Sequence, residues 1–376
     1  MKRYKSIDMI RGLCMIIMVA GHMLDWWLTE EDYWLYWLMY AIFAPIGASG
    51  FVFISGTATI LSYQKNILRP EASEKLFRQK LKNIYILRAS FLLLISFIYN
   101  YAVAIMYNDI SLIWSWNILQ TLSLSFILAY PLLKTSKIIR LILAIIILIA
   151  NEIILGITIS HIGQVNIYGV LYYILYNPLE LYPILPYFTV FLIGTVVGDL
   201  IYNVNLIEDQ AERKSAFKKG FIIPLFLLGF IITTLGIWYL FPNFLIRWTI
   251  SATLYSIGIL LLLISISFGL EEFEIFKMKQ NHRFFFFYSY YSFTIYLAHN
   301  PLYFLFYRQL NVITIWVAVV MVIALLTILL RVLYNKLGPK ASLKVGIAVL
   351  SFIIATKIEQ RNKKKILNKN PESSQL

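Results

Sequence analysis

The residues best suited to chemistry in this sequence lie at its start, in one apolar stretch. The segment Ser6–Gly12 carries Asp8 and Arg11, and the stretch continues to His22 and Asp25. Ionisable groups are costly inside a membrane, so their presence in such a segment calls for a reason. Asp8 and Arg11 are three residues apart, which places them on one helical face where they can pair. His22 lies about 16 Å further along such a helix, roughly halfway across a hydrocarbon core of ~30 Å.

His22 and Asp25 form the first candidate catalytic pair. They are also three residues apart, so the carboxylate could reach the imidazole and fix its tautomer, as in a general base. The alternative is that a neighbouring helix satisfies His22 and that Asp25 is only a solvated residue near the helix end. The functional interpretation predicts that both side chains face a bundle interior or a water-filled cavity.

Two arginines are candidates for binding an anionic cofactor. Arg11 can pair with Asp8 and still contact a phosphate, because a guanidinium has several N–H donors. Arg88 lies inside an apolar segment, too deep for an ordinary loop cation. It could snorkel to the interface or bind phosphate, and the sequence favours neither.

A second set of candidates lies later in the chain. His299 falls in the middle of an apolar segment, with Asn300 beside it. A lone histidine there would usually be structural, but a second one at the depth of His22 is a candidate site member. Glu180 could contact a polar acceptor, although the turn residues around it have a sufficient structural explanation. The sequence has no phosphate-binding glycine loop, GxSxG or HExxH motif, and no further ligands that would complete a metal site with the two histidines.

Composition places these residues in a membrane protein. Hydrophobic residues make up 60% of the 376 residues, charged residues 14%, and the mean hydropathy is +0.74. Soluble domains are about half apolar and a quarter charged. The net charge of +14 does not indicate nucleic-acid binding, because lysine and arginine collect in short loops and at both termini. The single cysteine, Cys14, excludes internal disulfides and a multi-cysteine metal site.

Apolar segments of bilayer-spanning length predict an all-α polytopic bundle of about ten transmembrane helices. A shorter stretch at 341–356 would be an eleventh, so we expect a transmembrane domain over 1–340 and a C-terminal hydrophobic segment with a basic tail over 341–376. Small residues in the second span, between Gly47 and Thr57, predict a close helix contact. The ten segments lie at 9–28, 43–63, 84–107, 113–133, 138–158, 183–203, 220–241, 245–269, 286–307 and 312–334.

Loop charge predicts the orientation. Basic residues are concentrated in Met1–Lys5 and in alternate loops from 64–83 onward, whereas the loop 29–34 is acidic. The basic side should be cytoplasmic, which places the N-terminus inside the cell in a plasma-membrane protein. If 341–356 crossed the membrane, the run Lys363–Lys365 would face outward. We therefore favour an interfacial or re-entrant segment that keeps this tail cytoplasmic.

The opening motif resembles that of a known superfamily. Ser6-x-Asp8-x-x-Arg11-Gly12 followed by His22 resembles the start of transmembrane acyltransferases, nearest to prokaryotic relatives of heparan-alpha-glucosaminide N-acetyltransferase. The resemblance extends over residues 3–310 and implies transfer of an acyl group, usually acetyl from acetyl-CoA, to a sugar hydroxyl or amine. The other segments that fit the pattern are Gly47–Gly56, Tyr182–Phe188 with Gly194, and Ser292–His299.

The resemblance also suggests which histidine acts. It aligns His22 with the first-helix histidine of the prokaryotic members, whereas the lysosomal enzymes have asparagine there and a proposed catalytic histidine in the following outer loop. No histidine occurs here between 23 and 160, so His22 must take that role if the activity is retained, with His299 as a candidate partner. Oriented by Asp25, His22 would be either a general base or a transient acyl carrier.

On this resemblance the two substrates would meet inside the membrane. Acetyl-CoA would enter from the cytoplasmic face, with Arg11, Asp8 and Arg88 as the cofactor-binding residues. A saccharide or glycolipid acceptor would approach the outer face near Glu180 and Asn300. The aromatic-rich loop at 159–182 could cover that site or form an interfacial belt. No metal cofactor is expected, and a homodimer is left open.

Two other functions fit parts of the pattern. A transporter or lipid-handling permease could use His22 and His299 as proton-relay groups. No internal repeat of the kind that transporters often show is visible in the sequence, which disfavours this alternative. The third is a catalytically inactive membrane scaffold. Consumption of the acetyl-CoA thioester would separate the enzyme from both.

Overall fold

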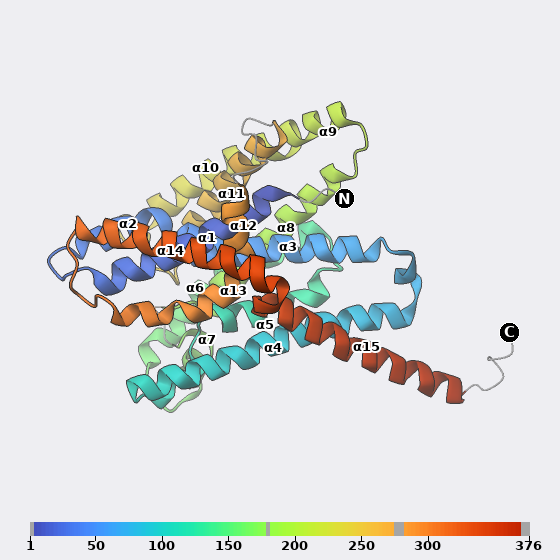
Figure 1. The fold of residues 1–376 in the computed structure, drawn as a ribbon, viewed down its shortest axis with the longest axis horizontal. Coiled ribbons are helices and arrows are strands. Elements are labelled where there is room, and N and C mark those ends of the chain that lie inside the picture. The colour runs from blue at the N-terminus through green and yellow to red at the C-terminus, as the bar shows by residue number, and fades with distance from the viewer. Residues whose placement is uncertain (1–3, 178–180, 274–281, 370–376) are drawn as a thin grey trace.

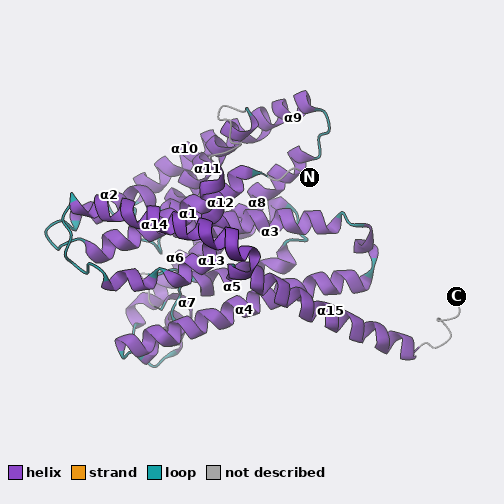
Figure 2. Cartoon of the chain, in the orientation of Figure 1, coloured by secondary structure: helices purple, strands orange, loops and turns teal. Residues whose placement is uncertain are grey.

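The chain folds into a bundle of helices (Figures 1 and 2). The computed structural model describes residues 4–177, 181–273 and 282–369, and over these ranges it contains helices and no β-strand. The α-helices are α1 (Lys5–Trp27), α2 (Trp34–Phe43), α3 (Gly50–Ile67), α4 (Lys75–Tyr107), α5 (Ile118–Leu132), α6 (Lys137–Thr158), α7 (Ile167–Tyr176), α8 (Ile184–Asn205), α9 (Gln210–Phe217), α10 (Ile223–Tyr239), α11 (Ile250–Glu272), α12 (His282–Tyr290), α13 (Ser292–Ala298), α14 (Thr314–Leu337) and α15 (Leu343–Lys369).

Nine segments within the described ranges are long and apolar enough to cross a membrane. The all-α polytopic architecture predicted from the sequence is therefore confirmed. They are Lys5–Trp27, Trp34–Ile67, Lys75–Met106, Ile110–Leu132, Lys137–His161, Ile184–Asn205, Gln210–Tyr239, Ile250–Glu272 and Thr314–Lys363.

The predicted span at 286–307 is wrong as a single helix. The structure divides it into α12, α13 and a 3-10 turn at Asn300–Phe304. A residue from a later segment stabilises the break: Ser342 Oγ donates to the Tyr290 carbonyl at 3.1 Å. Interrupted helices are tolerated in membranes where neighbouring protein groups satisfy the backbone in this way. Periodicity alone does not reveal such a break.

α15 runs along α4 toward the end of the bundle where the 64–83 segment lies (Figure 1). Lys80 Nζ pairs with Glu359 at 2.8 Å and sits 5.0 Å from the centre of the Phe352 ring. The C-terminal part of α15 thus lies at the same end of the bundle as that basic loop, as the preference for a re-entrant or interfacial segment requires. The turn between α14 and α15 begins at Gly338, which has a φ of 50°.

Helices α3 and α8 approach each other closely through glycines. A Cβ atom on Gly56 would lie 2.2 Å from the Phe191 carbonyl oxygen, and one on Gly194 would lie 2.2 Å from that of Phe53. Neither position can hold a side chain without separating the helices. The close helix contact predicted from the small residues of the second span is confirmed.

The N-terminus of α1 is held by a residue distant in sequence. Glu271 accepts hydrogen bonds from the backbone N–H groups of Lys5 and Ser6, at 3.1 and 2.7 Å, and from the Ser6 hydroxyl at 2.6 Å. The first N–H groups of a helix have no partner within it, and a carboxylate satisfies them well. This contact fixes the start of the helix that carries His22.

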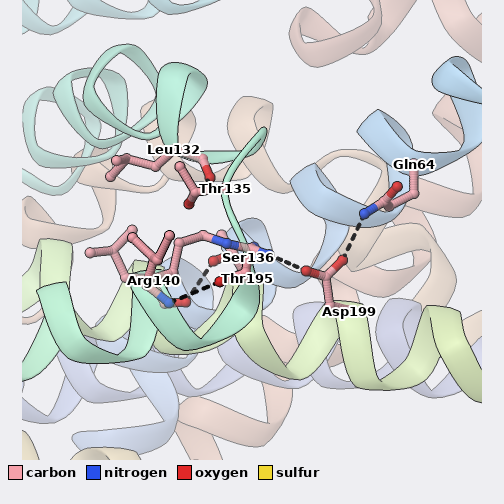
Figure 3. A network of polar contacts seen from close by, with 9 residues as sticks. Gln64, Leu132, Thr135, Ser136, Arg140, Thr195 and Asp199 are labelled. Atoms are coloured by element: carbon pink, nitrogen blue, oxygen red, sulfur yellow. Dashed lines mark hydrogen bonds and ion pairs between the residues drawn. The ribbon is translucent and has the colours of Figure 1, made fainter.

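A buried ion pair joins three helices in the protein interior (Figure 3). Arg140 of α6 is 1% exposed and pairs with Asp199 of α8. Gln64 of α3 donates to the other Asp199 oxygen at 3.0 Å. Because a buried charge without a partner is strongly destabilising, this network constrains how α3, α6 and α8 meet.

Candidate functional site

The two mid-membrane histidines lie together. The ring centres of His22, on α1, and His299, at the end of α13, are 5.0 Å apart. Trp26 packs beside both, with its ring centre 4.9 Å from that of His22 and 5.8 Å from that of His299. The two rings meet because the segment after α13 lies alongside the second half of α1. There, Trp27 Nε1 donates to the Leu302 carbonyl at 2.8 Å.

The tautomer of His299 follows from its hydrogen bond. Its Nδ1 lies 2.7 Å from the carbonyl oxygen of Tyr296, and a carbonyl can only accept, so Nδ1 carries the proton. The neutral imidazole then has its lone pair on Nε2. That atom is buried and has no hydrogen-bond partner in the described part of the chain. His299 therefore presents a buried basic nitrogen next to His22.

Asp25 does not hold His22, although their spacing on the helix predicts such a contact. Its carboxylate instead accepts a short hydrogen bond from the Tyr33 hydroxyl, at the beginning of the next helix. Burial, and secondarily this bond to Asp25, raise the pKa of Tyr33 to about 12. Tyr33 is thus protonated at physiological pH and remains the donor. Asp25 fixes the connection between α1 and α2 rather than the imidazole.

A cavity of about 390 Å³ adjoins His22 and Asp25. Its volume is within the range of small-molecule sites, and like them it is lined by apolar and aromatic side chains with a few polar groups. Residues from α1, α2, α8, α11 and α14 contribute to it, together with the π-helical turn Pro45–Ser49 that precedes α3. His22 and Asp25 both line this cavity.

The cavity also contains residues that the sequence pattern does not reveal. Arg247 lines it together with Tyr36, Tyr40, Tyr182 and Tyr187. Arg247 Nε donates to the Tyr40 hydroxyl at 2.5 Å. One signal was available in the sequence: Arg247 is a cation outside the lysine-rich loops. Its position inside the expected span 245–269 gives no further indication of a site.

The remaining predicted residues are scattered. Asp8 accepts from the Ser289 hydroxyl at 3.1 Å, one helical turn from Arg11 on α1. Arg88 is exposed on α4, and neither arginine lines the cavity. Asn300 accepts from the Tyr99 hydroxyl at 3.4 Å, next to His299. Glu180 lies outside the described residues. No group of three or more His, Cys, Asp or Glu side chains suited to a metal occurs in the described ranges.

Comparison with known families decides the assignment. Residues 3–241 match the family model of the heparan-alpha-glucosaminide N-acetyltransferase catalytic domain. The chain belongs to this family. The match includes His22, Asp25 and Tyr40, whereas Arg247 and His299 lie beyond it. No curated protein matches the chain. Membership of this family, together with the nine apolar helices in the described ranges, indicates a membrane enzyme of the acetyltransferase type.

Proposed function

We propose that this protein transfers an acetyl group from acetyl-CoA to a hydroxyl or amine of a saccharide or glycolipid, and that His22 and His299 form the reacting centre. The observation that carries the proposal is the pair itself. Two imidazoles from distant parts of the chain are 5.0 Å apart: His22 lines the cavity, and His299 has a buried nitrogen with no partner among the described residues. The heparan-alpha-glucosaminide N-acetyltransferase family supplies the reaction class.

The arrangement supports general-base catalysis. One imidazole takes the proton from the acceptor hydroxyl or amine as its oxygen or nitrogen bonds to the thioester carbonyl carbon. The carbon–sulfur bond then breaks, and the departing CoA thiolate takes up the proton. His299 suits the role of base because its Nδ1 bond to Tyr296 leaves Nε2 with the lone pair. His22 either acts as the base beside His299 or carries the acetyl group transiently.

The two substrates are expected to reach this centre from opposite ends. In this proposal, acetyl-CoA enters from the basic, cytoplasmic end of the bundle, with Arg11, Asp8 and Arg88 near its path. The acceptor enters from the outer end, near Asn300 and Glu180. The protein resides in the plasma membrane with its N-terminus inside, and residues 1–340 form the catalytic domain. The proposal includes a homodimer as the form that acts in the membrane.

The test uses full-length protein in lipid nanodiscs with acetyl-CoA labelled in the acetyl group. Label should move to a glycan acceptor, with release of free CoA thiol. A transporter or permease that uses the two histidines as a proton relay would leave the thioester intact, as would an inactive scaffold. Intact thioester with every glycan class offered would contradict the proposed function.

A further inference from the structure

The cavity beside His22 has a second polar end built around Arg247. Among the described residues that line it, Arg247 is the permanent cation and Asp25 the carboxylate. The Arg247 Cζ atom lies 5.0 Å from the centre of the Tyr40 ring and 5.6 Å from that of Tyr182. A guanidinium placed against aromatic rings at these distances is held by cation–π attraction as well as by its bond to Tyr40.

Two hydrogen bonds, at Trp248 and Ile250, hold the segment that carries Arg247 in place. The Trp248 carbonyl accepts from Asn151 Nδ2 at 2.8 Å, and Glu152 accepts from the backbone N–H of Ile250 at the start of α11. Both partners lie on α6, a helix with its own buried network at the other end. The guanidinium is therefore positioned before any ligand arrives, which lowers the entropic cost of binding.

The groups around Arg247 are hydrogen-bond donors more than acceptors. The Tyr40 hydroxyl accepts from Arg247, so its own proton can be donated elsewhere. The hydroxyls of Tyr36 and Tyr182 make no hydrogen bond with the part of the chain that the structure describes, and both residues line the cavity. The Asp25 carboxylate already accepts from Tyr33. A site rich in donors around a planar guanidinium is complementary to an oxyanion, which accepts from several donors at once.

We infer that this end of the cavity binds an oxyanion carried by the acyl acceptor, either a sugar carboxylate or the phosphate of a glycolipid. This inference rests on the proposed function, since it treats the ligand as the acceptor. The anionic group contacts Arg247 and the hydroxyls of Tyr40 and Tyr182, and the acceptor's reacting hydroxyl or amine lies toward His22. Arg247 lies at the end of the bundle opposite the lysine-rich 64–83 segment, so its ligand is the acceptor rather than the phosphates of CoA.

Binding without acetyl-CoA tests the inference independently of catalysis. The probes are an octyl glucoside, the matching octyl glucuronide and an octyl-phosphate-linked glucose, each titrated calorimetrically into the full-length protein in nanodiscs. We expect at least one anionic probe to bind about tenfold or more tightly than the glucoside, the scale of a charge-assisted hydrogen bond. The stronger of the two anionic probes identifies the source of the oxyanion. Equal binding of all three would overturn the inference.

Variants then assign the preference to Arg247. Arg247→Gln should abolish it, and Arg247→Lys should retain part, because lysine keeps the charge and lacks the planar fork. Arg331→Gln is the matched control: it removes one positive charge from an exposed position on α14 that does not line the cavity. Tyr40→Phe removes only a hydroxyl and should weaken the anionic probe several-fold, which keeps the test decisive if Arg247→Gln fails to fold. An unchanged preference in Arg247→Lys and Tyr40→Phe would overturn the assignment.

Kinetics separate the acceptor from the donor. In Arg247→Gln the KM for an anionic acceptor should rise about tenfold or more, while the KM for acetyl-CoA stays unchanged. A rise in the KM for acetyl-CoA instead would place the donor's phosphates at Arg247 and overturn the inference. If neither the unmodified protein nor any variant acetylates an acceptor, the proposed function is contradicted. The binding experiment with the anionic probes still tests this inference.

Discussion

The imidazoles of His22 and His299 lie 5.0 Å apart although they come from opposite ends of the chain. His22 is part of a continuous helix, whereas His299 follows a short helix and precedes a 3-10 turn. The interruption lets the His299 ring turn toward α1, and the Tyr296 carbonyl fixes which nitrogen carries the proton. The broken segment is thus the structural device that completes the pair.

Asp25 and Tyr33 should affect activity less than the histidines. Asp25→Asn keeps an acceptor for the Tyr33 hydroxyl and leaves the imidazole of His22 in place. We expect a decrease in turnover of less than about tenfold, and a similar decrease in Tyr33→Phe, because both changes weaken the same connection between α1 and α2. Rates of labelled acetyl transfer check this. A loss in Asp25→Asn as large as that caused by removing His22 would restore a direct role for the carboxylate.

The Arg140–Asp199 pair should dominate the response of the bundle to loss of a single charge. Asp199→Asn leaves the Arg140 guanidinium buried without a counter-charge, which costs about 3–5 kcal/mol. The melting temperature in detergent should drop, and adding Arg140→Met should recover part of the drop.

Glu359→Gln is the control for that experiment. It breaks the more exposed pair with Lys80, which is worth about 0–1 kcal/mol. If Asp199→Asn and Glu359→Gln melt at the same temperature, the buried network does not hold α3, α6 and α8 together.

Cysteine labelling tests the orientation in a Cys14→Ala background. Glu31→Cys and Lys75→Cys introduce thiols at exposed positions at opposite ends of the bundle. An impermeant reagent should modify position 31 in intact cells and position 75 only after permeabilisation, because basic loops stay inside. Lys363→Cys should behave like position 75, since Glu359 pairs with Lys80 near it. The opposite pattern would reverse the orientation and the proposed entry of both substrates.

Arg11 can be tested for a role in binding acetyl-CoA. Arg11→Lys keeps the charge beside Asp8 but loses bidentate contacts to a phosphate, so affinity for CoA should fall. Calorimetry on the full-length protein measures this affinity. Arg88→Lys is tested beside it, because Arg88 is the second predicted cofactor-binding arginine and is exposed on α4. The same CoA affinity in Arg11→Lys and the unmodified protein would leave Arg11 with a structural role alone.

The sequence revealed the helices and the residues of the pair, but not how the chain brings them together. Hydropathy located most spans because bilayer thickness sets their length. It missed the break in 286–307, which depends on Ser342, a residue far along the chain. The predicted Asp25–His22 contact does not form. Helical spacing shows only which residues share a face, and the Tyr33 hydroxyl takes the Asp25 carboxylate instead. Arg247 could not be ranked from sequence, since its role follows from tyrosines on α2 and beside α8 that only tertiary structure brings near it.

The most direct test of the account is the rate of labelled acetyl transfer by His22→Ala, measured in nanodiscs beside the unmodified protein. The substitution removes an imidazole from an otherwise apolar helix, so the protein should still fold and bind CoA. A general-base or acyl-carrier role predicts a loss of about 10²-fold or more in turnover. Turnover comparable to that of the unmodified protein would contradict the assignment of His22 and leave His299 as the sole histidine candidate for the catalytic base.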